Sequence, residues 1–143
     1  MGPIVCATRG GEASRRTQEH AIALARERGD PLIFLFVADS SFAHQDSRAL
    51  AEALADELER LGHSLLSIAQ VRAREQGISA EAAIRHGSVR QAIEDFLREV
   101  KASTLVLGAP GAGSEKKTFF PGELPQFAQE INTATGVDVI VVW

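Results

Sequence analysis

Leu-Ile-Phe-Leu-Phe-Val at residues 32–37 is an unbroken apolar run, and the polar stretch that starts at Asp39 closes it. A strand with one face in water alternates apolar and polar side chains, whereas a continuous run is typical of a strand covered on both faces. Strands of this kind belong to parallel sheets, because their crossover helices cover both faces. The run therefore favours an α/β fold.

Strand-like segments recur along the rest of the chain, bounded by glycine or polar turn residues. They cover residues 3–8, 78–84, 104–107 and 137–142. Helical periodicity, with apolar residues at steps of three or four, fills the intervals between them. The expected helices cover residues 14–28, 50–68, 88–101 and 123–133.

Capping residues mark several of these helix ends. Gly29 directly follows the first expected helix, as glycine commonly does at a helix C-terminus. Ser88, with Gln91 three residues later, is a capping-box pattern and predicts a helix start. Pro125 falls in the first turn of the last helix, where its missing N–H is tolerated. These local signals agree with the periodicity.

The leucine stripe from Leu50 to Ile68 leaves two interpretations open, a coiled-coil seam or packing against a sheet, and the strands on either side favour the sheet. Strands and helices alternate throughout, so we expect residues 1–143 to form one α/β domain. Its core is predicted to be a doubly wound, five-stranded parallel sheet with helices on both faces. Ligands bind such sheets outside the carboxyl ends of the strands, where the strand order reverses.

The composition narrows the function classes. Hydrophobic residues make up 45% of the 143 residues and charged residues 24%, which is ordinary for a globular protein. The net charge of −4 argues against a nucleic-acid or anionic-membrane partner. Cys6 is the single cysteine and lies in an apolar run, so we interpret it as a buried thiol. We recognise no signal peptide or membrane-spanning run, and we expect a cytoplasmic protein.

The segment from Gly108 to Gly122 is rich in glycine and carries two lysines. Backbone N–H groups of such a loop can approach an anion, and the following helix N-terminus can hold a phosphate. The segment matches neither the P-loop nor the dinucleotide-binding pattern. A surface loop with solvated lysines is the other interpretation. The residues of interest are Gly108, Gly111, Gly113, Lys116, Lys117 and Gly122.

Other polar residues give weaker signals. No histidine has metal-ligand spacing to another histidine or to the cysteine, so we expect no metal site. His86 lies at the rim of the expected cleft. Asp39 follows a strand and either faces a ligand or caps the next turn. No serine lies in a nucleophile elbow, and we assign no catalytic residue.

Several segments, taken in order, resemble the universal stress protein family. They are residues 4–14 (Ile-Val-Cys-Ala-Thr-Arg-Gly-Gly-Glu-Ala-Ser), 35–39 (Leu-Phe-Val-Ala-Asp), 86–93 (His-Gly-Ser-Val-Arg-Gln-Ala-Ile), 104–111 (Thr-Leu-Val-Leu-Gly-Ala-Pro-Gly) and 139–142 (Val-Ile-Val-Val). The resemblance implies strand order 3-2-1-4-5 and a homodimer through the last strand. Candidate interface residues are Val137, Val139, Val141 and Trp143.

The resemblance also implies a nucleotide cleft, because some members of the family bind ATP. Its expected residues lie at the ends of the first, second and fourth strands and in the glycine-rich segment. They are Ala7, Thr8, Arg9, Val37, Asp39, Leu107, Gly108, Gly111, Gly113, Lys116, Lys117, Gly122 and Glu123.

Three positions depart from the pattern of the ATP-binding members, which is Gly-x-x-Gly, nine residues, then Gly-Ser or Gly-Thr. Gly122 comes one residue late, and Glu123 replaces the small hydroxyl residue. Arg9 stands where those members carry an aspartate at the end of the first strand. An ionised carboxylate repels phosphate, and a guanidinium cannot accept a hydrogen bond from ribose or adenine. We therefore expect ATP binding to be weakened or lost.

The resulting hypothesis is a regulatory module without turnover, whose degenerate cleft binds an adenine nucleotide such as ATP, or another anion. Two alternatives stay open. One is a dimeric interaction protein that binds no nucleotide, with an unidentified protein partner. The other is a slow ATPase, for which no base or metal-binding carboxylate is identified. One fold hosts many functions, so the fold does not choose between these.

Overall fold

The computed structural model describes residues 2–9, 11–39, 48–108 and 123–142. Strands and helices alternate along these residues, as predicted. In chain order they are β1 (Ile4–Ala7), α1 (Gly11–Arg28), β2 (Leu32–Ala38), α2 (Arg48–Glu75), β3 (Glu81–His86), α3 (Val89–Val100), β4 (Thr104–Gly108), α4 (Glu123–Thr135) and β5 (Asp138–Val142).

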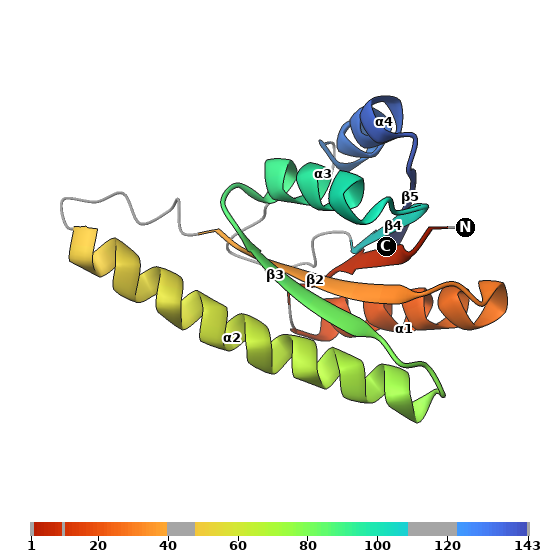
Figure 1. Cartoon of the computed structure of the whole chain (residues 1–143), viewed down its shortest axis with the longest axis horizontal. Coiled ribbons are helices and arrows are strands. Elements are labelled where there is room, and N and C mark those ends of the chain that lie inside the picture. The colour runs from red at the N-terminus through yellow and green to blue at the C-terminus, as the bar shows by residue number, and fades with distance from the viewer. Residues whose placement is uncertain (1, 10, 40–47, 109–122, 143) are drawn as a thin grey trace.

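All strand pairs are parallel, and the order across the sheet is β3-β2-β1-β4-β5. Helices α1 and α2 cover one face, and α3 and α4 cover the other (Figure 1). The predicted doubly wound sheet and its strand order are confirmed. Strand β1 lies at the centre, paired with β2 on one side and β4 on the other.

Strand β2 shows why its apolar run is unbroken. Phe34 and Phe36 point into the core beneath α1 and α2, whereas Ile33 and Leu35 point into the core beneath α3 and α4. Both faces of the strand are buried, so every position needs an apolar side chain. Cys6 lies fully buried in the first of these cores, as predicted.

Strand β3 begins at Glu81, not at residue 78 as the sequence predicted. The difference lies in how α2 ends. Gly77 adopts a left-handed conformation with φ +81°, its N–H donates to the carbonyl of Arg74, and the N–H of Ile78 donates to the carbonyl of Ala73. This is the Schellman arrangement, in which an apolar residue after the glycine packs back onto the helix. Ile78 therefore belongs to the helix cap.

Two other predicted caps are present. Gly29 has φ +70° and its N–H donates to the carbonyl of Ala25, which closes α1. The Ser88 hydroxyl accepts the N–H of Gln91 at 3.3 Å and starts α3. The Gln91 amide donates onward to Asp95 at 2.8 Å instead of back to Ser88. The described contacts thus contain one half of the capping box.

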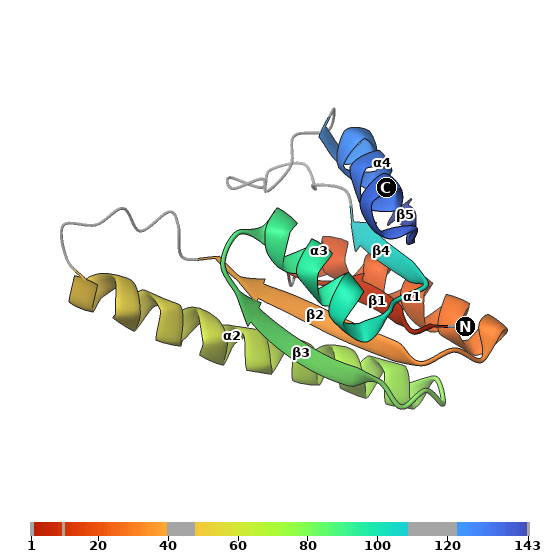
Figure 2. The same ribbon diagram turned by 45° about the horizontal axis from the view of Figure 1, so that its top comes forward.

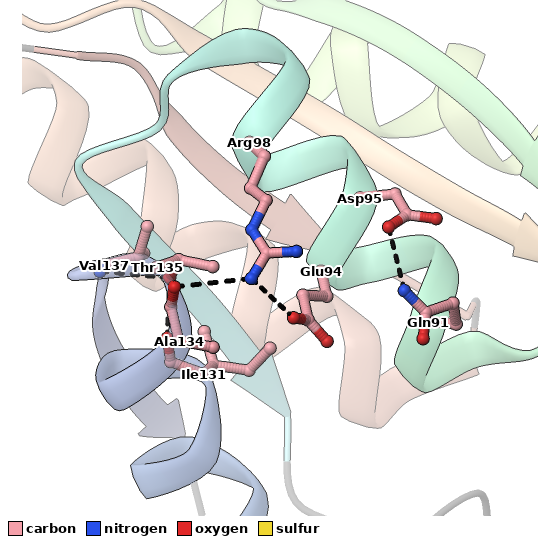
Figure 3. A network of polar contacts seen from close by, with 8 residues as sticks. All are labelled: Gln91, Glu94, Asp95, Arg98, Ile131, Ala134, Thr135 and Val137. Atoms are coloured by element: carbon pink, nitrogen blue, oxygen red, sulfur yellow. Dashed lines mark hydrogen bonds and ion pairs between the residues drawn. The ribbon is translucent and has the colours of Figure 1, made fainter.

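Figure 3 shows how α4 connects to β5. The guanidinium of Arg98 on α3 pairs with Glu94 at 2.9 Å and donates to the Ala134 carbonyl on α4 at 3.4 Å. The Thr135 hydroxyl donates to the carbonyl of Ile131 and accepts the N–H of Val137 at 3.2 Å. These contacts satisfy backbone groups at the C-terminus of α4 and direct the chain into β5.

Helix α2 packs on the sheet, as predicted, and runs to Glu75. Leu66 and Ala69 are buried against β2, and Gly62 lies against the ring of Phe36. In both views the helix projects past the ends of β2 and β3 (Figures 1 and 2). The predicted stripe is only partly inward, however, because its members Leu50, Leu61 and Ile68 stay exposed, as does Val71. The helix is longer than the part of the sheet that it covers, so one helix face cannot be buried along its whole length. Within the described ranges, no helix combines the length and the hydropathy that crossing a bilayer requires.

Candidate functional site

The crevice between the carboxyl ends of β1 and β4 is the candidate site. The chain leaves β1 for α1 on one face of the sheet, whereas it leaves β4 for the segment that leads to α4 on the other face. Where successive strands send the chain to opposite faces, a crevice opens at the carboxyl edge of the sheet. Thr8 and Arg9 directly follow β1, and Gly108 ends the neighbouring strand β4. We call the region between these two strand ends the crevice.

The structure places most of the predicted site residues that it describes at the carboxyl ends of three neighbouring strands. Ala7, Thr8 and Arg9 end β1, Val37 and Asp39 lie at the end of β2, and Leu107 and Gly108 end β4. Leu107 is 5% exposed, and its side chain belongs to the core beneath α3 and α4. Glu123 is the first residue of α4. Gly111, Gly113, Lys116, Lys117 and Gly122 lie outside the described residues.

Thr8 is held by a buried hydrogen-bond chain. Its N–H donates to the Leu35 carbonyl at 2.9 Å, and its hydroxyl accepts from the side-chain amide of Gln18 at 2.7 Å. The amide oxygen of Gln18 accepts in turn from the guanidinium of Arg72 on α2 at 2.8 Å. Thr8 and Gln18 are 3% and 2% exposed, so neither can exchange these partners for water. The chain links the floor of the crevice to both helices on that face.

Gly108 is required by a close approach of α1 to β4. A Cβ atom at this position would overlap the hydroxyl of Thr17, which is itself buried. Thr17 and Gln18 thus place two consecutive polar side chains between α1 and the ends of β1 and β4. The glycine lets the α1 backbone settle against the crevice wall.

Arg9 brings positive charge to the mouth of the crevice. Its N–H donates to the hydroxyl of Ser14 at 3.2 Å, which fixes the turn between β1 and α1. Partial burial of the guanidinium lowers its pKa, although the residue as a whole stays exposed. The ordinary pKa of arginine is so high that the group stays protonated at neutral pH. The chain therefore carries a permanent positive charge directly after β1.

The remaining polar candidates have structural partners. His86, at the end of β3, lies 3.1 Å from the Glu59 carboxylate on α2. Asp39 lies half-buried at the end of β2. In the part of the chain that the structure describes, no cluster of three or more His, Cys, Asp or Glu residues could hold a metal ion.

The sequence analysis did not single out Thr17, Gln18 or Arg72. A weak signal for the first two was present, because the inward stripe of α1 continues backward from Ala21 at helical spacing to residues 17 and 18. Polar residues at inward positions of a helix predict partners in the core. The partnership with Arg72 depends on where α2 packs, and no local pattern shows that.

The comparisons with known proteins agree with this architecture. The family model described as "Universal stress protein family" matches residues 1–142. The chain belongs to this family. The resemblance seen in the sequence is thereby confirmed. Comparison with curated protein sequences gives no match.

Solved structures of family members share the fold. One from Burkholderia pseudomallei is 19% identical, with a TM-score of 0.74 over 99% of this chain and 95% of that one. A universal stress protein in complex with cAMP is 25% identical, with a TM-score of 0.71 over 99% and 97% of the two chains. A family protein from Arabidopsis thaliana with AMP bound is 16% identical, with a TM-score of 0.67 over 99% and 91%.

Proposed function

We propose that this chain is a regulatory module that binds an adenine nucleotide in the crevice between β1 and β4. The observation that carries the proposal is the reversal of strand order between β1 and β4, because open α/β sheets bind ligands at such a point and a charged arginine directly follows β1 here. Support comes from the two family members whose structures contain cAMP and AMP. The proposed role includes no turnover, because the Thr8 hydroxyl is held by an amide, which is not a general base.

The charges favour a monophosphate over ATP. Arg9 can donate to one phosphate group, and charge-assisted hydrogen bonds of this kind are strong. Glu123 is the first residue of α4. An acidic residue at a helix N-terminus is favoured by the helix dipole, and it disfavours additional phosphates nearby. AMP and cAMP carry less negative charge than ATP, so an acidic residue at this position repels them less.

Calorimetric titration of nucleotide-free protein tests the proposal. We expect AMP or cAMP to bind with a micromolar Kd and ATP to bind more weakly. Replacing Arg9→Ala should weaken AMP binding about tenfold, since it removes one charge-assisted contact. Arg60→Ala is the matched control, because Arg60 lies exposed on α2 and pairs with Glu57 at 2.7 Å. No heat at millimolar nucleotide from folded protein would exclude the proposal, and tighter binding of ATP would overturn the preference for a monophosphate.

A second function is favoured by the outer edge of β5. This strand ends the sheet, and its apolar residues Val139 and Val141 are only half-buried. We propose that two copies pair through this edge to form a homodimer. This dimer would act in the cytoplasm by binding a partner protein. Val137 lies 3% exposed in the chain's own core and offers little surface to a second copy. Trp143 lies outside the described residues.

A further inference from the structure

We propose that the opposite edge of the sheet, strand β3, is a second self-association surface, which pairs antiparallel with β3 of another copy about a two-fold axis at Ala83. Among the described residues, β3 pairs with β2 alone and is the last strand on its side of the sheet. An edge strand presents a row of peptide groups that can pair with another chain. The occupant we assign to this edge is the chain itself.

The charges of β3 are complementary to themselves. Glu81 and Arg85 lie at equal distances along the strand on either side of Ala83. A two-fold axis through Ala83 therefore places Glu81 of each copy opposite Arg85 of the other. Side chains at alternate positions share a face, so both pairs form on the face where Ala83 packs against the core beneath α3 and α4. Opposite charges directly across an antiparallel pair stabilise it, and they fix its register.

The side chains of β3 permit a close approach. Glu81 and Ala82 are exposed, and Glu81 forms no ion pair with the described residues. Edge strands that avoid pairing often carry proline, lysine or a bulge, and β3 contains neither proline nor lysine. Small alanines at the centre leave the peptide groups accessible.

Arg85 is already positioned at this edge. Its guanidinium pairs with Glu99 at 2.6 Å and lies 4.8 Å from the centre of the Phe96 ring. It also donates to the Ile84 carbonyl at 2.9 Å. A guanidinium has five N–H donors, so it can hold Glu99 and a second carboxylate together. Pairing requires Arg85 to release the Ile84 carbonyl to a peptide N–H of the second copy.

Helix α2 leaves room for the second copy. It packs over both β2 and β3, and a cavity of about 430 Å³ lies between it and β3. The cavity is lined on the α2 side by polar residues, among them Glu59, His63 and Gln70. A helix centred over β2 and β3 would lie about two strand spacings, or ~10 Å, from its symmetry mate. Packed helices lie 8–10 Å apart, so the two helices would meet through these polar flanks without overlap.

A cysteine placed on the proposed axis tests the register. Cβ atoms directly opposite in an antiparallel pair lie about 4.5–5.5 Å apart, close to what a disulfide needs. We expect Ala83→Cys to form an intermolecular disulfide under mild oxidation in most of the protein. Ala82→Cys is the matched control, because residue 82 would lie opposite residue 84 of the other copy and point to the α2 face. Buried Cys6 adds no background. Equal cross-linking of both variants, or of neither, would overturn the proposal.

Charge reversal tests the same pairing without a covalent bond. In an Ile140→Arg background, which places a charge on the β5 edge, either Glu81→Arg or Arg85→Glu alone should raise the dimer Kd at least tenfold in analytical ultracentrifugation, because like charges then face each other. An equimolar mixture of the two variants should associate again, since each copy then supplies the charge that the other lacks. Glu19→Arg, on the surface of α1, is the control reversal. Failure of the mixture to recover, or singles that associate like the wild type, would contradict the pairing.

Ile140→Arg places a charge on the β5 edge and should block pairing there, so that pairing through β3 can be tested by itself. This substitution should leave Ala83→Cys cross-linking unchanged. Loss of the cross-link in this background would show that β3 contacts depend on a β5 dimer, which would contradict an independent surface.

Discussion

Gln18 is the residue on which the shape of the crevice floor depends. It donates to Thr8 and accepts from Arg72, and it is 2% exposed. Replacing Gln18→Leu keeps the size of the side chain and removes both bonds. A buried polar group left without a partner costs about 1–3 kcal/mol, so we expect the free energy of unfolding to fall by about that amount. Urea denaturation followed by circular dichroism measures it.

The control for this variant is Gln126→Leu on α4. Gln126 is exposed and donates to Glu130 at 3.1 Å, so its loss should change stability by less than about 0.5 kcal/mol. Equal effects of the two substitutions would show that the buried chain contributes nothing beyond an ordinary surface contact.

Cys6 makes the free energy of unfolding depend on pH in the alkaline range. Burial raises the pKa of its thiol from 9.0 to about 12. Below pH 9 the thiol is protonated in both the folded and the unfolded state. Above pH 9 the thiol ionises in the unfolded state and stays protonated in the folded state. Ionisation lowers the free energy of the unfolded state, so the free energy of unfolding falls. The free energy of unfolding then falls by up to about 1.4 kcal/mol per pH unit.

Urea midpoints at pH 8, 9 and 10 test this dependence against a Cys6→Ala variant. The chain contains no tyrosine, which keeps that group from titrating in the same window. We expect the decline between pH 9 and 10 to be steeper in the wild type than in the variant. Parallel declines would mean that the thiol ionises as readily in the folded state as in the unfolded one.

Residue-scale features that act within one turn could be predicted from the sequence, and those that join distant segments could not. The Gly29 cap and the Ser88 cap depend on neighbours within the same helix, so their local patterns sufficed. The chain from Thr8 through Gln18 to Arg72 joins three elements that meet only after folding. Periodicity can show that Gln18 faces inward, but it cannot name the partner.

At the scale of elements, the long helix α2 depends on one glycine. Gly62 is buried against Phe36, and a Cβ atom there would lie 2.5 Å from a ring carbon of that side chain. In a helix interior, alanine is more stabilising than glycine by about 1 kcal/mol, because of its higher helix propensity. Overpacking a core costs about 1–3 kcal/mol, and Phe36 is buried and cannot swing into solvent. We expect Gly62→Ala to lower stability by about 1 kcal/mol in thermal and urea unfolding.

The matched control is Ser64→Ala, on the exposed side of the same helix. This change should leave stability equal or slightly raised, because only helix propensity acts there. Phe36→Leu in the Gly62→Ala background should restore part of the loss. Stabilisation by Gly62→Ala alone would show that α2 and β2 can shift apart to accommodate the added methyl group at little cost.

The boundary of β3 shows where element prediction failed. Ile78 and Ala80 have the apolar character of a strand, and the sequence analysis counted them in one. In the structure they pack on the core as part of the helix cap and the turn that follows it. Apolar residues near a helix end serve the cap as readily as a strand, so composition alone could not separate the two.

At the scale of the whole molecule, the strand order was predicted through the family resemblance and the layering through the apolar patterns. The candidate site follows from both, because the reversal between β1 and β4 fixes where a crevice opens. The glycine-rich segment after β4 lies outside the described residues, so its predicted contribution stays a prediction.

Nuclear magnetic resonance of ¹⁵N-labelled protein titrated with AMP shows directly whether the crevice between β1 and β4 binds an adenine nucleotide. We expect the amides of Thr8, Arg9 and Gly108 to shift most and to saturate together, while the amide of Ala82 on the β3 edge stays unchanged. A second cavity, about 310 Å³ between α1 and α2 and lined by Arg26 and Arg72 among others, offers a competing cationic surface. Shifts confined to that cavity, or no shifts at millimolar AMP in folded protein, would contradict the account.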